Sequence, residues 1–268
     1  MQPGYTLVTG ASRGLGKFFA RAVAARKQNL ILVARSGEKL NAIASELRAA
    51  HGVLVEPIVF DLATRGAGQQ LAQLLRARDL PVNLLVNNAG FAVRGEFWKI
   101  SLERQLEMIN LHNVSVVELI FNLLPSMIER RDAGIINVSS MAGFQPLPYA
   151  TLYSATKAFL TTFSMALREE LRGTGVIIVT VCPGRLRADP EEEDSQTQRE
   201  RVPGRESLHE EVVRETLKKF DSGGGLVVPG RANRLMVMGQ RLIPPNAVPK
   251  IVARASHPKD SPPKTSEG

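Results

Sequence analysis

Short runs of β-branched and aliphatic residues alternate along the chain with longer segments whose apolar positions recur at helical spacing. The short runs predict strands over residues 5–10, 29–34, 53–60, 82–87, 133–139, 175–182 and 225–228. The segments between them predict helices over residues 14–27, 37–50, 65–78, 102–130, 149–173 and about 208–221. Runs such as Leu30–Val33 are continuously apolar, which is typical of strands buried on both faces. The pattern therefore predicts an α/β fold, a Rossmann-like, doubly wound parallel sheet of about seven strands with helices on both faces.

We expect residues 1–243 to form one domain of this kind. Residues 185–222 interrupt the alternation with charged and turn-forming residues, and we expect this excursion to form a lid over a substrate site. The basic, amphipathic stretch 231–243 predicts a helix that closes the core, with contact to a membrane surface or a partner as the alternative. Residues 244–268 are rich in Pro, Lys and Ser and predict a partly disordered tail.

Composition narrows the class of protein. The net charge is +8, but the basic residues form no compact run and the aromatic residues are not interleaved with them, which argues against a nucleic-acid partner. The one cysteine, Cys182, excludes an intrachain disulfide and indicates a reducing compartment, so we expect a cytoplasmic protein. The chain enters an apolar strand without a leader pattern, and no stretch approaches the roughly 20 apolar residues of a transmembrane segment. We expect no metal site, and each of the four histidines is most simply a surface or helix residue.

A glycine-rich segment, Thr9–Gly16, follows the first strand and opens the first helix. Its glycines permit a tight turn, and the N–H groups at the helix start favour an anion, so the segment predicts a phosphate-binding turn. The same residues match the G-x-S-x-G nucleophile elbow of α/β-hydrolases. A hydrolase serine normally lies further inside the sheet order, with an acid and then a histidine downstream, so we reject that alternative.

The second strand ends at Ala34-Arg35, where a site that prefers NAD would place an acidic residue. Arg35 and Arg13 instead flank the position of a 2′-phosphate, and guanidinium groups suit phosphate, so this pair favours NADP(H). Asp61, at the end of the third strand, could accept a hydrogen bond from the adenine amino group or cap the following helix.

Tyr153 and Lys157 lie four residues apart and therefore share one face of the predicted helix. A phenol is a poor proton donor or acceptor at neutral pH, and a neighbouring ammonium favours the phenolate and lowers the pKa of such a phenol. The spacing alone is common on solvated helices, so its meaning depends on the rest of the chain.

Taken together, these motifs resemble the short-chain dehydrogenase/reductase family, compact single-domain type. The resemblance covers roughly residues 5–185 and includes Asn87–Gly90, Asn137–Ser140 and Pro183-Gly184. It implies that Tyr153 is the general acid or base, that Lys157 assists it and binds the nicotinamide ribose, that Ser140 holds the substrate oxygen, and that Asn110 supports a water relay. Because successive side chains of a strand point to opposite faces, Ser139 should face away from the side that Ser140 occupies. The residues implied to contact the cofactor are Gly10, Ser12, Arg13, Gly14, Leu15, Gly16, Arg35, Asp61, Leu62, Asn88, Ala89, Gly90, Tyr153, Lys157, Pro183, Gly184 and Leu186. One departure is Ala188, which stands near the place where many members carry a threonine.

We therefore expect an NADPH-dependent oxidoreductase that reduces a carbonyl to an alcohol, or catalyses the reverse reaction. The alternative is a non-catalytic, reductase-like protein that binds NADP(H) as a sensor or scaffold. The segments near 91–98, 141–150 and 185–215 should form the substrate pocket, and their apolar residues suggest a hydrophobic carbonyl compound. Those residues are Phe91, Phe97, Trp98, Met141, Phe144, Leu147 and Tyr149. The resemblance further implies a homodimer or homotetramer formed through helices 102–130 and 149–173.

Overall fold

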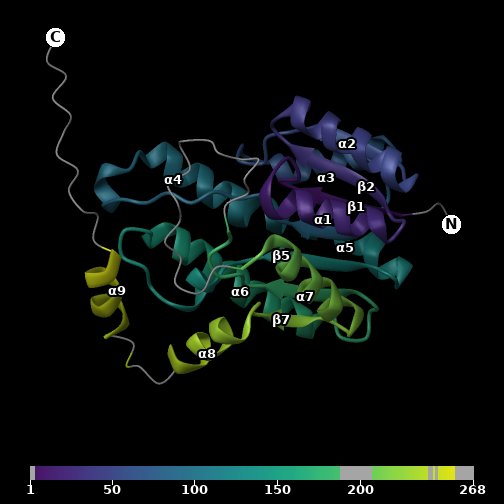
Figure 1. Cartoon of the computed structure of the whole chain (residues 1–268). Helices are drawn as coiled ribbons and strands as arrows, with labels where there is room; N and C mark the ends of the chain where they lie inside the picture. The colour runs from purple at the N-terminus through teal and green to yellow at the C-terminus, as the bar shows by residue number, and fades with distance from the viewer. Residues whose placement is uncertain (1–3, 188–206, 241–243, 245–246, 257–268) are drawn as a thin grey trace, which may run out of the picture.

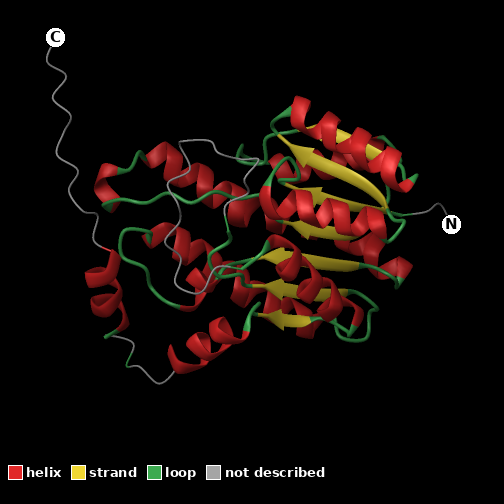
Figure 2. Ribbon diagram, viewed as in Figure 1, coloured by secondary structure: helices red, strands yellow, loops and turns green. Residues whose placement is uncertain are grey.

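A single parallel sheet organises the molecule. The computed structural model describes residues 4–187, 207–240, 244 and 247–256, and within them seven strands pair in the order β3-β2-β1-β4-β5-β6-β7 (Figure 2). The strands are β1 (Tyr5–Thr9), β2 (Asn29–Ala34), β3 (Val55–Val59), β4 (Val82–Asn87), β5 (Gly134–Val138), β6 (Ile177–Val181) and β7 (Gly225–Val227). Every adjacent pair is parallel, as the continuously apolar strands predict.

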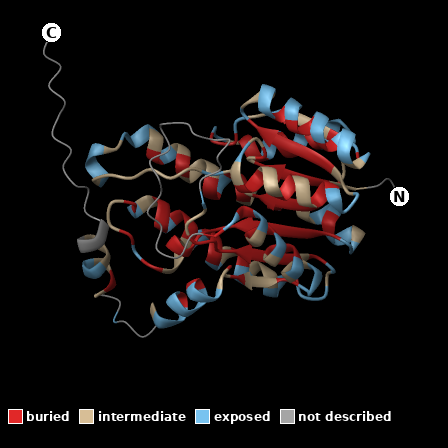
Figure 3. Ribbon diagram, in the orientation of Figure 1, coloured by how far each residue is buried: buried red, intermediate tan, exposed pale blue. Residues whose placement is uncertain are grey.

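Helices cover both faces of the sheet, which leaves the strands buried between two apolar layers (Figures 1 and 3). One layer contains residues of α1 (Gly14–Ala25), α2 (Gly37–His51) and α7 (His209–Asp221). The other contains residues of α3 (Ala67–Ala77), α5 (Ser115–Arg130) and α6 (Thr151–Glu170). The predicted doubly wound α/β fold is confirmed.

The strand order fixes where a ligand can enter. β1 pairs with β2 on one side and with β4 on the other, so the chain reverses its direction of winding between β1 and β4. In open α/β sheets, ligands bind at such a switch point, outside the carboxyl ends of the strands. The segments that follow β1, β4 and β5 therefore form the candidate site.

Most predicted elements are present, with ends that differ by a few residues. Tyr149 has a φ of 65°, which a right-handed helix cannot accommodate, so α6 starts at Thr151 rather than at residue 149. The predicted helix 102–130 consists of three parts, α4 (Leu102–Ile109), a π-helical turn η2 (Asn110–Val114) and α5. Two 3₁₀ turns, η1 (Phe97–Lys99) and η3 (Met141–Phe144), lie in predicted loops.

The C-terminal third adds two short helices. The predicted helix 231–243 is observed as α8 (Arg231–Gln240), and residues 241–243 lie outside the described part of the chain. A further helix, α9 (Val248–Ser256), occupies part of the predicted tail and was not anticipated. Half of the excursion 185–222, residues 188–206, also lies outside the described residues, and this half includes Ala188. The excursion ends with α7 (His209–Asp221), close to the predicted helix 208–221.

Within the described residues, one helical stretch, Leu102–Arg130, has the length and apolar composition of a bilayer-spanning helix. This corrects the expectation that no stretch approaches that length. Its buried side chains, among them Leu119 and Met127, pack into the core beneath the sheet, and 44% of the apolar window is buried. Packing against the sheet accounts for the apolar residues on the buried side of this stretch.

Candidate active site

The glycine-rich turn after β1 is closed tightly by its own backbone. A Cβ added at Gly16 would lie 2.3 Å from the carbonyl oxygen of Gly10 and 2.6 Å from Nδ2 of Asn88. Gly10 and Gly14 have φ values of 65° and 50°, in the left-handed region that glycine favours. Beside Gly14 the space is open, since the nearest atom to an added Cβ is Nε2 of His209 at 3.9 Å. The first turn of α1 contains no acidic residue, so the turn fits the diphosphate of a dinucleotide.

Asn88 and Thr9 hold this turn against the end of β4. The Asn88 side chain donates to the carbonyl oxygens of Thr9 at 2.9 Å and Gly10 at 3.3 Å. The Thr9 hydroxyl accepts from the backbone N–H groups of Asn88 and Ala89 and donates to the carbonyl of Val86. Asn88 therefore shapes the turn through Gly10, and Thr9, which the sequence analysis did not single out, joins the two segments at the switch point.

The two arginines that were predicted to bind a 2′-phosphate lie at the edge of this crevice. Arg13 precedes α1 and Arg35 follows β2, and both side chains are exposed. Asp61 is also exposed, and its Oδ1 accepts from the N–H of Ala63 at 2.9 Å, several residues before α3 begins at Ala67. The Asp61 carboxylate therefore caps the turn that follows β3 and does not cap α3. The Leu62 side chain is buried in the core, so only its backbone can face a cofactor.

Ser140, Tyr153 and Lys157 are at most 9% exposed and lie at the carboxyl end of β5 and on α6. Lys157 Nζ donates to the carbonyl oxygen of Val138 at 3.0 Å and lies 5.8 Å from the centroid of the Tyr153 ring. The Ser140 oxygen accepts from the N–H of Ala142 at 3.1 Å, which orients the hydroxyl and leaves its hydrogen for another acceptor. The structure thus gathers the phenol and ammonium of α6 with a hydroxyl that lies 13 residues before Tyr153 along the chain.

Ser139 faces α6, unlike its neighbour Ser140. Its hydroxyl donates to the carbonyl oxygen of Lys157 at 2.8 Å and lies 2.7 Å from the Thr161 hydroxyl. Further along α6, Asn137 of β5 donates to the Ser164 hydroxyl and accepts from Asn87 of β4, both at 2.8 Å. These buried bonds fix α6 relative to the sheet, and with it the positions of Tyr153 and Lys157.

The segment after β6 closes the site from the other side. The Pro183 carbonyl accepts from the N–H of Met141 at 2.9 Å, and Pro183 and Gly184 are buried. A Cβ on Gly184 would lie 2.9 Å from Nδ2 of Asn233 in α8, so a larger residue here would have to displace the Asn233 amide. Leu186 forms a parallel β-bridge with Ser207, which brings the start of α7 beside the segment 185–187.

Asn110 begins the π-helical turn η2, and its carbonyl oxygen accepts from the N–H of Ser115. Such turns are rare in helices and occur frequently at functional sites. The turn directs two consecutive residues toward α6: Asn113 donates to the Thr156 carbonyl at 3.0 Å, and His112 Nδ1 lies 3.0 Å from the Thr156 hydroxyl.

His112 lies in the helical turn η2, in line with the expectation of a surface or helix histidine, but it is buried and hydrogen-bonded at both ring nitrogens. It is 1% exposed, and its Nε2 accepts from the N–H of Phe91 at 3.1 Å. Its ring lies edge-on to Tyr153 with 5.9 Å between centroids. Burial, and secondarily the charge of Lys157, hold the pKa of His112 well below its usual value, so the imidazole is neutral. His209 is also buried and stacks on Phe18 at 4.8 Å.

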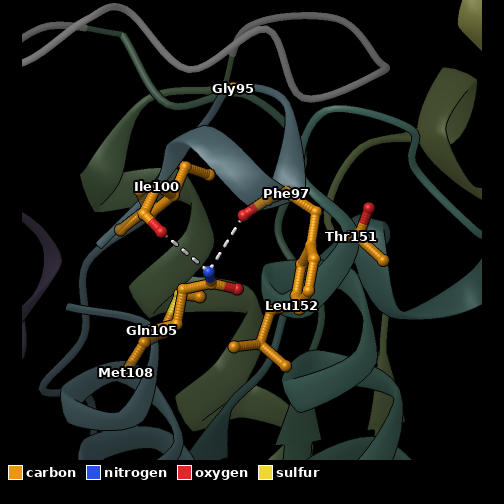
Figure 4. A pocket seen from close by; sticks show the side chains of 8 residues that line it. Gly95, Phe97, Ile100, Gln105, Met108, Thr151 and Leu152 are labelled. Atoms are coloured by element: carbon orange, nitrogen blue, oxygen red, sulfur yellow. Dashed lines mark hydrogen bonds between the residues drawn. The ribbon is translucent and has the colours of Figure 1, made fainter. Parts of the chain in front are cut away.

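A small apolar pocket lies between the segment 93–100, α4 and the start of α6 (Figure 4). The Gln105 side chain donates to the carbonyl oxygens of Phe97 and Ile100, at 3.1 and 3.2 Å, and so holds the outer wall of the pocket. Leu152, which precedes Tyr153, forms the opposite wall. Of the apolar residues predicted for the substrate pocket, Phe97 lines this pocket and Trp98 is exposed, whereas Met141 and Leu147 are buried.

Comparison with known proteins identifies relatives. The family model for short chain dehydrogenase matches residues 5–199. Ketoacyl reductase HetN from Nostoc is 40% identical over 180 residues, which are 66% of this chain and 62% of HetN. A very-long-chain 3-oxoacyl-CoA reductase from Anas platyrhynchos is 37% identical over 185 residues, covering 67% of this chain and 58% of the duck protein. The chain thus spans about three fifths of the length of these curated relatives.

Solved structures agree over nearly the whole chain. A 7β-hydroxysteroid dehydrogenase has a TM-score of 0.82 at 25% identity, covering 93% of this chain and 96% of that one. A short-chain dehydrogenase from Sphingobium yanoikuyae in complex with NADPH has a TM-score of 0.78 at 30% identity, covering 89% and 94%. The resemblance expected from the motifs is confirmed, and the chain belongs to the short-chain dehydrogenase/reductase family of oxidoreductases.

Proposed function

We propose that this protein reduces the carbonyl group of a hydrophobic substrate to an alcohol with NADPH, or catalyses the reverse oxidation. The observation that carries the proposal is the convergence of Ser140, Tyr153 and Lys157, all nearly excluded from solvent, at the carboxyl edge of the sheet. The glycine turn and the ends of β1 and β4 fit a dinucleotide at the same edge.

Each side chain has a distinct role in the proposed reaction. The Ser140 hydroxyl, oriented by the N–H of Ala142, donates to the substrate carbonyl oxygen. Tyr153 gives its phenolic proton to that oxygen. NADPH held by the glycine turn and the end of β4 would supply the hydride chemistry when bound. Lys157, anchored on the Val138 carbonyl, places its positive charge beside the phenolate that results. Asn110, at the start of the π-helical turn, would support the water relay that restores the proton.

NADPH is the proposed cofactor because two arginines and no acidic residue stand where β2 and the glycine turn end. Arg13 and Arg35 are both exposed at the mouth of the crevice, where a 2′-phosphate would meet them. The solved relative from Sphingobium yanoikuyae, which is bound to NADPH, supports this preference.

The apolar surroundings of Tyr153 support a hydrophobic substrate. Tyr153 belongs to a buried cluster with Met108, Ala142, Leu147 and Ala150, against which Phe91, Val93 and Leu152 pack. Two relatives are named as reductases of ketoacyl and 3-oxoacyl-CoA substrates, so 3-oxoacyl thioesters are the first class to test. Ketosteroids come second, because a solved relative is a hydroxysteroid dehydrogenase.

The decisive test measures NADPH oxidation with 3-oxoacyl thioesters of increasing chain length and with ketosteroids, for the wild type and for Tyr153→Phe. We expect turnover by the wild type, loss of at least about a hundredfold in kcat for the variant, and similar NADPH affinity in both. Tight NADPH binding with no turnover of any substrate would favour the alternative, a cofactor-binding sensor or scaffold.

We also propose that the protein is a homodimer or homotetramer formed through α4, α5 and α6. Val116 and Leu119 of α5 are buried in the core, but Phe121 on α5 and Phe159 on α6 are 77% and 45% exposed. Light scattering coupled to gel filtration tests this assembly, and Phe121→Glu should shift it toward the monomer.

A further inference from the structure

Outside the Ser140, Tyr153 and Lys157 set, the buried imidazole of His112 has a hydrogen-bond partner at each ring nitrogen. Its Nε2 accepts from the N–H of Phe91, and a backbone N–H can only donate, so Nε2 carries no hydrogen. The Thr156 hydroxyl donates its single hydrogen to the carbonyl oxygen of Tyr153, at 2.8 Å. It must therefore accept from Nδ1 of His112, 3.0 Å away. The contacts assign one form of the ring, neutral and protonated at Nδ1.

This ring joins three segments that are distant in the sequence. Phe91 follows Gly90 at the end of the Asn88–Gly90 segment, which faces the dinucleotide crevice. Thr156 lies on α6 between Tyr153 and Lys157, and His112 itself is two residues from Asn110 in η2. All three segments belong to the proposed site, the first on the cofactor side and the other two through Asn110 and through Tyr153 and Lys157. From η2, the imidazole is hydrogen-bonded to the first segment and to α6.

The surroundings of the ring leave it little freedom. A Cβ added at Gly90 would lie 2.8 Å from Nε2 of His112, so the glycine makes space for the ring. Asn113 adds a second bond from η2 to Thr156. The guanidinium of Arg104 covers the Phe91 ring at 3.7 Å from its centroid, which restrains the residue that donates to Nε2.

We propose that His112 is a positioning residue. It fixes the positions of the cofactor-facing segment and of α6 relative to Asn110. It touches neither the substrate nor the reacting atoms. It acts through Phe91 on the cofactor side and through Thr156 on the side of Tyr153 and Lys157. This inference rests on the proposed reduction for its kinetic consequences, but not for its hydrogen-bond assignment.

Two substitutions of His112 test its hydrogen bonds to Phe91 and to Thr156 separately. The oxygen of His112→Gln can reach the position of Nε2 and accept from Phe91, but it offers no donor at the position of Nδ1. The amide of His112→Asn can donate to Thr156 but is too short to reach Phe91. We expect His112→Gln to keep NADPH affinity within about twofold and to lower kcat about tenfold, with the alkaline limb of its pH profile displaced by about half a unit. We expect His112→Asn to keep the kcat profile and to weaken NADPH binding about tenfold.

The experiment measures NADPH affinity by fluorescence titration and kcat against pH for both variants. His51→Gln, at the end of α2, is the matched control and should change neither quantity. Equal losses of kcat and of NADPH affinity in both variants, or no loss in either, would overturn the proposal, since a purely structural role would not separate the two readouts. Thr156→Val, which removes the acceptor from the other end, should reproduce the His112→Gln pattern.

A measurement on the wild type keeps the inference testable if the variants do not fold. The ¹⁵N chemical shifts of the His112 ring at pH 7 should report a neutral ring protonated at Nδ1. A charged ring or the opposite tautomer would overturn the assignment. NADPH titration and the ring spectrum need no substrate, so failure to reduce any carbonyl would count against the proposed function alone.

Discussion

The ammonium group of Lys157 donates a hydrogen bond to the carbonyl oxygen of Val138 at 3.0 Å. This bond holds the lysine charge on α6 against the last residue of β5. Ser139, the next residue of the chain, binds the Lys157 carbonyl at 2.8 Å. The lysine is thus held at both its side chain and its backbone by the strand that leads to Ser140. The sheet edge, rather than solvent, determines where this charge stands relative to the Tyr153 ring.

The first prediction concerns that charge. Lys157→Met keeps a similar volume but removes the ammonium, so kcat should fall about a hundredfold or more while the melting temperature changes little. Steady-state kinetics and a thermal melt measure the two quantities. Lys39→Met on the exposed face of α2 is the control and should leave both unchanged. A Lys157→Met enzyme with wild-type kcat would remove the ammonium from the proposed mechanism.

The second prediction concerns the hydroxyl that joins β1 to β4. Thr9→Val removes the acceptor of two backbone N–H groups and the donor to Val86, so unfolding should become easier by about 2–3 kcal/mol. Thr6→Val is a matched control in the same strand, because its hydroxyl makes one side-chain bond, to Gln28. Denaturant titration compares the two variants, and an equal, small loss in both would show that the Thr9 network contributes little.

The third prediction tests the closure of the glycine turn. Gly16→Ala would place a methyl group 2.3 Å from the Gly10 carbonyl oxygen, so the turn must open and NADPH affinity should fall about tenfold or more. Gly239→Ala in α8 is the control, since an added Cβ there meets no atom within 4 Å. Fluorescence titration with NADPH measures both. Unchanged affinity in Gly16→Ala would mean that the turn does not shape the cofactor site.

The sequence predicts those parts of the site that local spacing determines. Tyr153 and Lys157 share a helix face because they are four residues apart, and the glycines of the turn follow a strand directly. His112 could not be found in this way, because its burial depends on partners 21 and 44 residues away, Phe91 and Thr156. It also depends on the π-helical turn, which the apolar pattern of residues 102–130 does not distinguish from a continuous α-helix.

Helix α9 was missed for a compositional reason. The Pro and Lys content of residues 244–268 is typical of a tail, but Pro249 falls in the first turn of the helix, where proline is tolerated. The short apolar set that follows includes Val252, which packs against the cluster around Tyr153. Such packing is a tertiary contact, so the sequence pattern alone could not reveal it.

The fourth prediction concerns cofactor choice. Arg35→Ala should weaken NADPH binding about tenfold and leave NADH binding nearly unchanged, because only NADPH carries the 2′-phosphate that the guanidinium would bind. Arg172→Ala, an exposed arginine that pairs with Glu169 at the end of α6, is the control for loss of positive charge. Equal effects on both cofactors would contradict the proposed phosphate contact.

The fifth prediction concerns the pH dependence of stability. The titratable groups facing His112 are Lys157 and Tyr153, both on α6. The acidic residues of the helices on either side of η2 have other partners: Glu118 of α5 accepts from the N–H of Gly68, and Glu107 of α4 pairs with Arg104. Because burial holds the pKa of His112 below its usual value, the unfolded chain binds a proton that the folded protein excludes. The stabilising contribution is fully present above about pH 6.5 and is lost as the pH falls toward the pKa of the folded state.

Equilibrium unfolding between about pH 5 and pH 8 tests this sign. The wild-type free energy of unfolding should decrease on acidification more steeply than that of His112→Gln, by up to about 1.4 kcal/mol per pH unit for one proton. His51→Gln, at the end of α2, is the control for replacing an imidazole by an amide away from the cluster around Tyr153. Identical slopes in the wild type and His112→Gln would mean that the folded protein accepts the proton. The Phe91 N–H would then face an N–H on the ring, which is incompatible with the hydrogen bond between them.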